Sequence, residues 1–202
     1  MKIPASLKKA ALVLVLFLLP AQAAADPLLF NQMGIVTPKI SKPAPDFKLK
    51  NIRGGVTQLS DFKGKIVLIN FWATWCGACV EEMASMQNLY GNLKEQGVEI
   101  VAISIDRWNE DRIMEYADKN KLTFHILRDP DQTVRKKYYV MGLPTSYLID
   151  GEGKIRGYAS GARTWDSSAS KNALLSLKGN GSVAELATEK LTMRVDPSLP
   201  QN

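Results

Sequence analysis

The residues best suited to chemistry are the two cysteines, Cys76 and Cys79, which lie three positions apart in the run Trp-Cys-Gly-Ala-Cys. An apolar run over 66–72, typical of a buried strand, precedes them, and a stretch with helical spacing, 80–96, follows. Both sulfurs are therefore expected at the first turn of a helix, where free amides and the helix dipole stabilise a thiolate. Because the thiolate is the form that attacks disulfides, this stretch predicts a dithiol that cycles between oxidised and reduced states.

The composition is that of a globular protein, and the 202 residues are enough for one ordinary domain with short extensions. The formal net charge is +6. Lys2, Lys8 and Lys9 lie in a segment that we expect to be removed, which leaves +3 from 23 basic and 20 acidic residues. This mild, dispersed charge does not support a nucleic-acid partner, and we expect none.

The N-terminus has the layout of a secretory signal peptide, which we assign to residues 1–25. Basic residues precede an apolar block over 10–19, and a small-residue run over 21–25 offers a cleavage site. The alternative is an uncleaved membrane anchor, although the block is shorter than the roughly 20 residues that span a bilayer. The protein is therefore expected in the periplasm, or facing it from an anchor. Exported compartments are oxidising, but a disulfide across three residues closes too small a loop to stabilise a fold.

Four segments are expected: the signal peptide, an extended lead-in over 26–42, one domain over 43–178, and a C-terminal tail over 179–202. Within the domain, strands and helices alternate, which predicts an α/β fold with a mixed central sheet, helices on both faces and an N-terminal β-hairpin. The expected strands cover 47–49, 56–59, 66–72, 98–105, 124–127, 146–150 and 154–159, and the expected helices cover 80–96, 110–119, 132–139 and 166–177. Active groups in such sheets gather at the carboxyl ends of strands, where the cysteine pair lies.

With these elements in view, the chain resembles the thioredoxin superfamily and is most similar to its exported TlpA/ResA-like branch. The resemblance covers 43–177 and implies a thioredoxin-like fold and thiol-disulfide oxidoreductase activity. It is carried by the runs 45–47, 59–65, 70–79 and 142–150, together with Glu82 and Gly153.

The resemblance implies catalytic roles for three residues. Cys76 would be the attacking nucleophile, Cys79 the resolving thiol, and Glu82 the carboxylate that manages the proton of Cys79. Thioredoxin uses an aspartate on the preceding strand for that proton, and Asn70 takes its place here. The alternative is that Glu81 and Glu82 are only acidic residues favoured in a first helical turn.

The resemblance also implies a substrate-binding surface. Pro144 would follow a cis peptide bond and face the disulfide, which lets the backbone of Leu143 pair with an extended substrate strand. Trp75 is expected to form an exposed apolar rim, and Gly77 and Ala78, between the cysteines, complete the surface. That dipeptide also affects the redox potential, so the direction of electron flow stays open.

No cofactor or metal is expected. A zinc site needs more ligands than two cysteines, and the only histidine, His125, lies on a short apolar strand and is assigned no role. The implied partners are protein thiols and disulfides, such as apocytochrome c or copper chaperones, and a membrane-embedded thiol donor of electrons. A monomer is expected.

The leading hypothesis is an exported reductase of protein disulfides, as used in cytochrome c maturation or copper-protein assembly. A disulfide oxidase or isomerase is the alternative in the same chemical class. A peroxiredoxin is rejected, because Ala73 and Ile69 stand where that family needs a hydroxyl residue and a proline. A non-catalytic binding module would tolerate the loss of Cys76.

Overall fold

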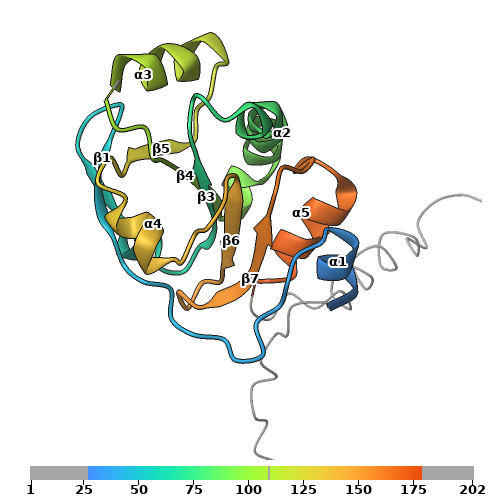
Figure 1. The fold of residues 1–202 in the computed structure, drawn as a ribbon. Coiled ribbons are helices and arrows are strands. Elements are labelled where there is room, and N and C mark those ends of the chain that lie inside the picture. The colour runs from blue at the N-terminus through green and yellow to red at the C-terminus, as the bar shows by residue number, and fades with distance from the viewer. Residues whose placement is uncertain (1–26, 109, 179–202) are drawn as a thin grey trace, which may run out of the picture.

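The computed structural model describes residues 27–108 and 110–178 (Figure 1). Seven strands form one mixed sheet in the order β2-β1-β5-β4-β3-β6-β7. The strands are β1 (Lys48–Asn51), β2 (Val56–Gln58), β3 (Ile66–Trp72), β4 (Val98–Ser104), β5 (His125–Arg128), β6 (Thr145–Ile149) and β7 (Ile155–Ser160). The helices are α1 (Pro27–Gln32), α2 (Gly77–Leu93), α3 (Glu110–Lys119), α4 (Thr133–Lys137) and α5 (Ser168–Leu175), with single 3-10 turns at Leu59–Phe62 and Lys94–Gln96. The expected α/β class and the N-terminal hairpin, β1 against β2, are confirmed.

The two central strands are buried along their whole length because helices cover both faces of the sheet. In β3, Leu68 and Trp72 pack toward α2, α3 and α5, while Val67, Ile69 and Phe71 pack toward α4 and the turn Leu59–Phe62. This two-sided burial explains why the strand is an apolar run and not an alternating one. Asn70 is its one polar member and faces the α2 side, between Leu68 and Trp72.

Strand pairing brings two loops that are distant in the sequence together at the same end of the central strands. β4 runs parallel to β3, so Ser104 lies opposite Trp72 where both strands end. β6 runs antiparallel to β3 and begins with Thr145 opposite Phe71. The residues just before β6 therefore lie beside the loop that carries the cysteines.

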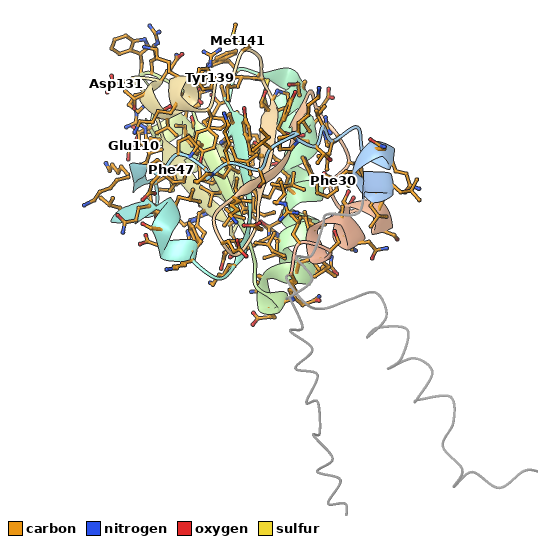
Figure 2. The ribbon with its side chains drawn as sticks, turned by 90° about the horizontal axis from the view of Figure 1, so that it is seen from below. Phe30, Phe47, Glu110, Asp131, Tyr139 and Met141 are labelled. Carbon is orange, nitrogen blue, oxygen red and sulfur yellow. A yellow bond between two sulfur atoms is a disulfide. The ribbon has the colours of Figure 1, made fainter. Side chains whose placement is uncertain are left out.

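The prediction of an extended lead-in over 26–42 is wrong for residues 27–32. Residues 27–32 form α1, which packs against α5, and Phe30 is fully buried (Figures 1 and 2). The segment then runs along β7, where Val36 and Tyr158 exchange backbone hydrogen bonds of 2.8 and 3.0 Å. The assigned signal peptide and the C-terminal tail lie outside the described residues.

Gly157 of β7 has no side chain, which lets Phe30 and Ile35 of the N-terminal segment pack directly against the strand. A Cβ atom at this position would lie 2.5 Å from Ile35 Cγ2 and 2.8 Å from Phe30 Cε2, which is closer than atoms pack. Both side chains are buried, so neither can move freely aside. Phe30 and Ile35 have no helical or strand spacing between them, which is why their burial could not be predicted from periodicity.

We predict that Gly157→Ala destabilises the protein by about 1–3 kcal/mol, because the new methyl group overpacks the contact with Phe30 and Ile35. Urea unfolding measures the change. Gly91→Ala is the matched control, since this glycine lies in α2 with no atom within 4 Å of the added Cβ. The control should stabilise by about 0.5–1 kcal/mol, and equal effects at both positions would contradict the packing argument.

Candidate active site

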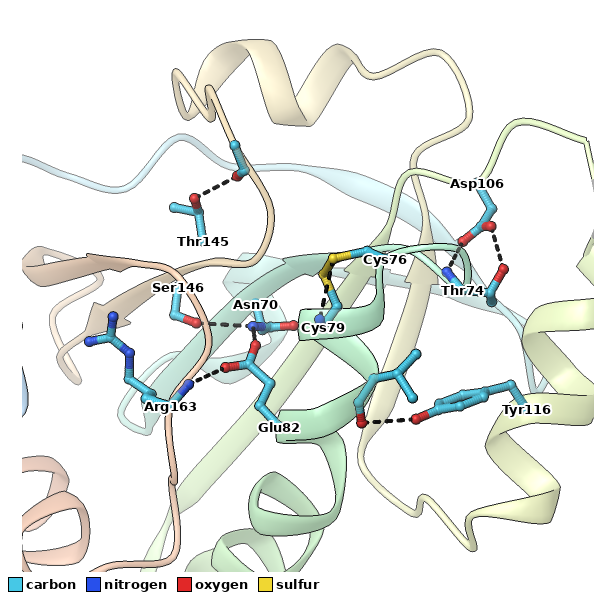
Figure 3. Close-up of a disulfide and its surroundings, with 12 residues drawn as sticks. Asn70, Thr74, Cys76, Cys79, Glu82, Asp106, Tyr116, Thr145, Ser146 and Arg163 are labelled. Atoms are coloured by element: carbon cyan, nitrogen blue, oxygen red, sulfur yellow. Dashed lines mark hydrogen bonds between the residues drawn. A yellow bond between two sulfur atoms is a disulfide. The ribbon is translucent and has the colours of Figure 1, made fainter.

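The cysteines form a disulfide at the tip of α2 (Figure 3). Cys76 is the N-cap residue, and its Sγ accepts the backbone N–H of Cys79 at 3.3 Å. The helix therefore begins at Gly77, three residues earlier than the spacing predicted. Cys76 is half-buried, whereas Cys79 is fully buried in the core under α2. The two sulfurs thus differ in access to a partner molecule.

Asp106, just beyond the end of β4, holds the loop that leads into the cysteines. Its carboxylate accepts the backbone N–H of Thr74 at 3.0 Å and the Thr74 hydroxyl at 2.7 Å. The Ser104 hydroxyl donates to the same carboxylate at 2.7 Å. Asp106 was not predicted as a functional residue, although a carboxylate just past a neighbouring parallel strand was a usable signal.

Glu82 is buried, with 2% of its surface exposed, and its carboxylate accepts three hydrogen bonds. Asn70 Nδ2 donates to Oε1 at 2.7 Å, while the backbone N–H of Arg163 and the indole N–H of Trp165 donate to Oε2 at 3.2 and 3.1 Å. Asn70 Nδ2 also donates to Ser146 Oγ at 3.0 Å, which fixes the amide between β3 and β6 (Figure 3). Arg163 and Trp165 were not singled out from the sequence, because no local pattern connects them to Glu82.

Burial raises the pKa of Glu82 above its ordinary value, because the charged carboxylate loses its hydration. Hydrogen bonds from Asn70, Trp165 and the Arg163 backbone, and the positive charge of Arg163, act in the opposite direction but do not cancel the effect. The neighbouring Glu81 is exposed. Glu82 is therefore distinct from an acidic residue that only favours a helix start, and a carboxyl with a raised pKa is a stronger proton acceptor than an ordinary one.

The loop before β6 lies beside the disulfide loop. The Leu143–Pro144 peptide bond is cis, and the Thr145 hydroxyl donates to the Gly142 carbonyl at 2.8 Å. In the part of the chain that the structure describes, neither the backbone N–H nor the carbonyl of Leu143 has a hydrogen-bond partner. An unpaired backbone segment of this kind can receive an extended strand.

The residues next to Cys76 along the chain are exposed. Trp75 is 63% exposed, and Gly77 and Ala78 are exposed at the helix tip. Trp75 shares a groove of about 320 Å³ with Trp108, which is 92% exposed and was not predicted from the sequence as a surface residue. Such exposed tryptophans are typical of surfaces that bind a partner.

His125 lies away from the cysteines, at the opposite end of the parallel strands, and its Nε2 is 3.5 Å from Glu99 Oε2. Among residues 27–108 and 110–178, no three metal-ligating side chains gather in one place. Within the same residues, no helix is long and apolar enough to cross a membrane.

The disulfide at a helix tip, the buried carboxyl and the cis-proline loop agree with what comparison with known proteins finds. Residues 40–158 match the AhpC/TSA family. The chain belongs to this family. The thiol-disulfide oxidoreductase ResA of Oceanobacillus iheyensis is 43% identical over 132 residues, covering 63% of this chain and 68% of the relative. ResA of Bacillus thuringiensis subsp. konkukian is 40% identical over 126 residues, covering 62% and 72%.

Solved structures agree with the family assignment. A DsbE-type thiol:disulfide interchange protein from Chlorobium tepidum has 33% identity and a TM-score of 0.64, covering 69% of this chain and 97% of that one. StoA from Bacillus subtilis has 27% identity and a TM-score of 0.53, covering 63% and 93%. The protein is therefore a thiol-disulfide oxidoreductase with a thioredoxin-like fold, as the resemblance implied.

The buried carboxyl of this oxidoreductase predicts a specific pH dependence of stability. Since the pKa of Glu82 is higher in the folded than in the unfolded state, the folded state binds its proton more tightly. This contribution to stability is present at low pH and is lost as the pH rises from the ordinary carboxyl value through the raised one. In Glu82→Gln that loss should be absent.

Urea unfolding of the oxidised protein between about pH 4 and 8 measures this effect as the difference between wild type and Glu82→Gln. The stability of the variant relative to wild type should increase with pH. Glu81→Gln changes an exposed carboxyl one residue away and should follow the wild-type curve. Parallel curves for wild type and Glu82→Gln would contradict the raised pKa.

Proposed function

We propose that this protein is an exported reductase of protein disulfides, in which Cys76 attacks, Cys79 resolves and Glu82 accepts a proton. One observation carries the proposal. The half-buried Cys76 at the helix tip is joined by a disulfide to the buried Cys79, and the same helix carries Glu82, a buried carboxyl with a raised pKa. Cys79 and Glu82 are three residues apart, so they lie on the same face of α2.

The reaction begins with the reduced dithiol. The Cys76 thiolate, stabilised by the free amides of the first turn, attacks one sulfur of a substrate disulfide. A mixed disulfide forms, and the other substrate sulfur leaves as a thiolate that takes a proton from solvent. Cys79 remains a thiol at this stage and supplies the electron pair for the second step.

Resolution takes place inside the protein. The Cys79 thiol transfers its proton to the Glu82 carboxylate, and the resulting thiolate attacks Cys76 Sγ. The bond between Cys76 and the substrate breaks, and the second substrate sulfur leaves as a thiolate that takes a proton from solvent. The Cys76–Cys79 disulfide holds the oxidation equivalents, and the protonated Glu82 returns its proton to solvent.

The substrate would lie across the helix tip and the cis-proline loop. The free backbone groups of Leu143 would pair with an extended segment of the substrate, while Pro144 closes the site beside the disulfide. Trp75, Gly77 and Ala78 would contact the residues that flank the substrate cysteine. A polypeptide disulfide fits this surface better than a small molecule, because it supplies both a backbone and apolar flanks.

The cellular role follows from the predicted export. A reductase in an oxidising compartment needs a continuous supply of electrons, and a membrane-embedded thiol donor would provide them. Its substrates would be proteins whose cysteines must stay reduced for assembly, such as apocytochrome c before haem attachment or copper chaperones. The protein is proposed to act in the periplasm, free or held by its N-terminal segment, as a monomer.

The central test is a trapping experiment. Cys79→Ala removes the resolving sulfur, so the Cys76 mixed disulfide should accumulate and be released by dithiothreitol. Purification from the exported fraction followed by mass spectrometry identifies the attached proteins. The control Cys76→Ser should trap nothing, and equal recovery from both variants would overturn the assignment of Cys76 as the nucleophile.

The direction of electron flow has a separate measurement. Equilibration with glutathione buffers should place the potential of the Cys76–Cys79 pair nearer the thioredoxin value of about −270 mV than the DsbA value of about −120 mV. A potential near the DsbA value would favour the oxidase alternative and leave the chemistry of the two cysteines intact.

A further inference from the structure

The guanidinium group of Arg163 joins the N-terminal segment to the loop that contacts Glu82. Its Nη1 donates to the carbonyls of Met33 and Gly34 at 2.8 and 3.4 Å. Its Nη2 donates to the carbonyls of Ser160 and Gly161 at 2.8 and 3.2 Å. Four carbonyls from two chain segments are therefore held by one planar group, a geometry for which arginine is suited and lysine is not.

The same loop supplies two of the three donors to Glu82. The backbone N–H of Arg163 itself and the indole N–H of Trp165 both reach Oε2. The guanidinium carbon lies 5.7 Å from the centre of the Trp165 ring, so the guanidinium group also makes a cation–π contact with the indole. In Figure 3 the Arg163 side chain extends away from Glu82 while its backbone N–H is directed at the carboxylate.

We propose that Arg163 is a positioning residue for the redox reaction, whose guanidinium clamp holds the backbone N–H of residue 163 and the Trp165 indole on the Glu82 carboxylate. The inference rests on the proposed function only in that Glu82 is taken to accept the Cys79 proton. Without the clamp, the loop between β7 and α5 would lose its attachment to the N-terminal segment. The two donors would then meet Oε2 for a smaller part of the time.

Loss of these bonds should raise the pKa of Glu82. Hydrogen bonds to a carboxylate favour its charged form, so weakening two of them leaves burial less opposed and raises the pKa of Glu82 further. Removal of the Arg163 charge acts in the same direction. At acid pH, where the ionised fraction of Glu82 limits proton transfer, resolution by Cys79 should therefore become slower.

The test uses Arg163→Ala and Arg163→Lys in the full chain. Carbon-13 NMR of the oxidised protein, labelled at glutamate carboxyl carbons, follows the titration of Glu82 without any turnover; the resonance is assigned by its loss in Glu82→Gln. Stopped-flow reduction of a synthetic disulfide peptide gives the pH profile of the reaction. In Arg163→Ala, the NMR midpoint and the acid limb of the profile should both move to higher pH. The rate on that limb should fall about fivefold or more.

Arg163→Lys separates the clamp from the charge. Lysine keeps the positive charge but cannot bond four carbonyls at once, so most of the alanine effect should remain. If Arg163→Ala fails to fold, the lysine variant alone still shows whether the Glu82 titration and the pH profile depend on the clamp. Arg53→Ala is the matched control, because Arg53 also bonds a backbone carbonyl, that of Leu122 at 2.8 Å, far from Glu82. It should change neither titration nor profile.

Two results would overturn the inference: an unmoved Glu82 titration in Arg163→Ala, or a wild-type titration in Arg163→Lys. A third result has a different meaning. If the NMR midpoint moves while the pH profile of turnover does not, the clamp is supported and the proposed role of Glu82 in proton transfer is wrong.

Discussion

The carboxylate of Glu82, buried beneath the first turns of α2, is the interaction on which the rest of the site depends. A charge in this position is costly unless hydrogen bonds replace its lost water. The donors come from Asn70, 12 residues before Glu82, and from Arg163 and Trp165, 81 and 83 residues from it. The sheet must therefore place β3 under α2, and the β7–α5 connection must return to the same point, before the carboxylate can be accommodated.

The same packing gives the two sulfurs their different surroundings. α2 is fixed below by the contacts of Glu82, and the loop before it is fixed by the bonds of Thr74 to Asp106. Cys76 consequently stays at the helix tip, where free amides and the dipole favour a thiolate, while Cys79 stays in the core. This support keeps the two cysteines in different surroundings, as the proposed roles of an attacking and a resolving thiol require.

Much of this arrangement could be predicted from the sequence because its signals are local. β3 and β4 are apolar runs, and the cysteines lie between a strand and a helix. Other features depend on contacts between distant segments. The buried face of α2 includes Cys79, Glu82 and Leu89. A glutamate interrupts an apolar pattern, and the donors that allow its burial carry no local signature. Only the resemblance pointed to Glu82, and nothing pointed to Arg163, Trp165 or the docking of Phe30.

Asn70 and Glu82 are best understood as one unit. An aspartate at position 70 would place a second carboxylate within hydrogen-bond distance of Glu82, and one of the two would then have to hold a proton. The neutral amide avoids this conflict, since its nitrogen donates to Glu82 and to Ser146 at once. Of this pair only Glu82 is ionisable, and it lies on the same face of α2 as Cys79. With asparagine at position 70, the proton acceptor of the proposed mechanism lies on the helix that carries the cysteines and not on the strand.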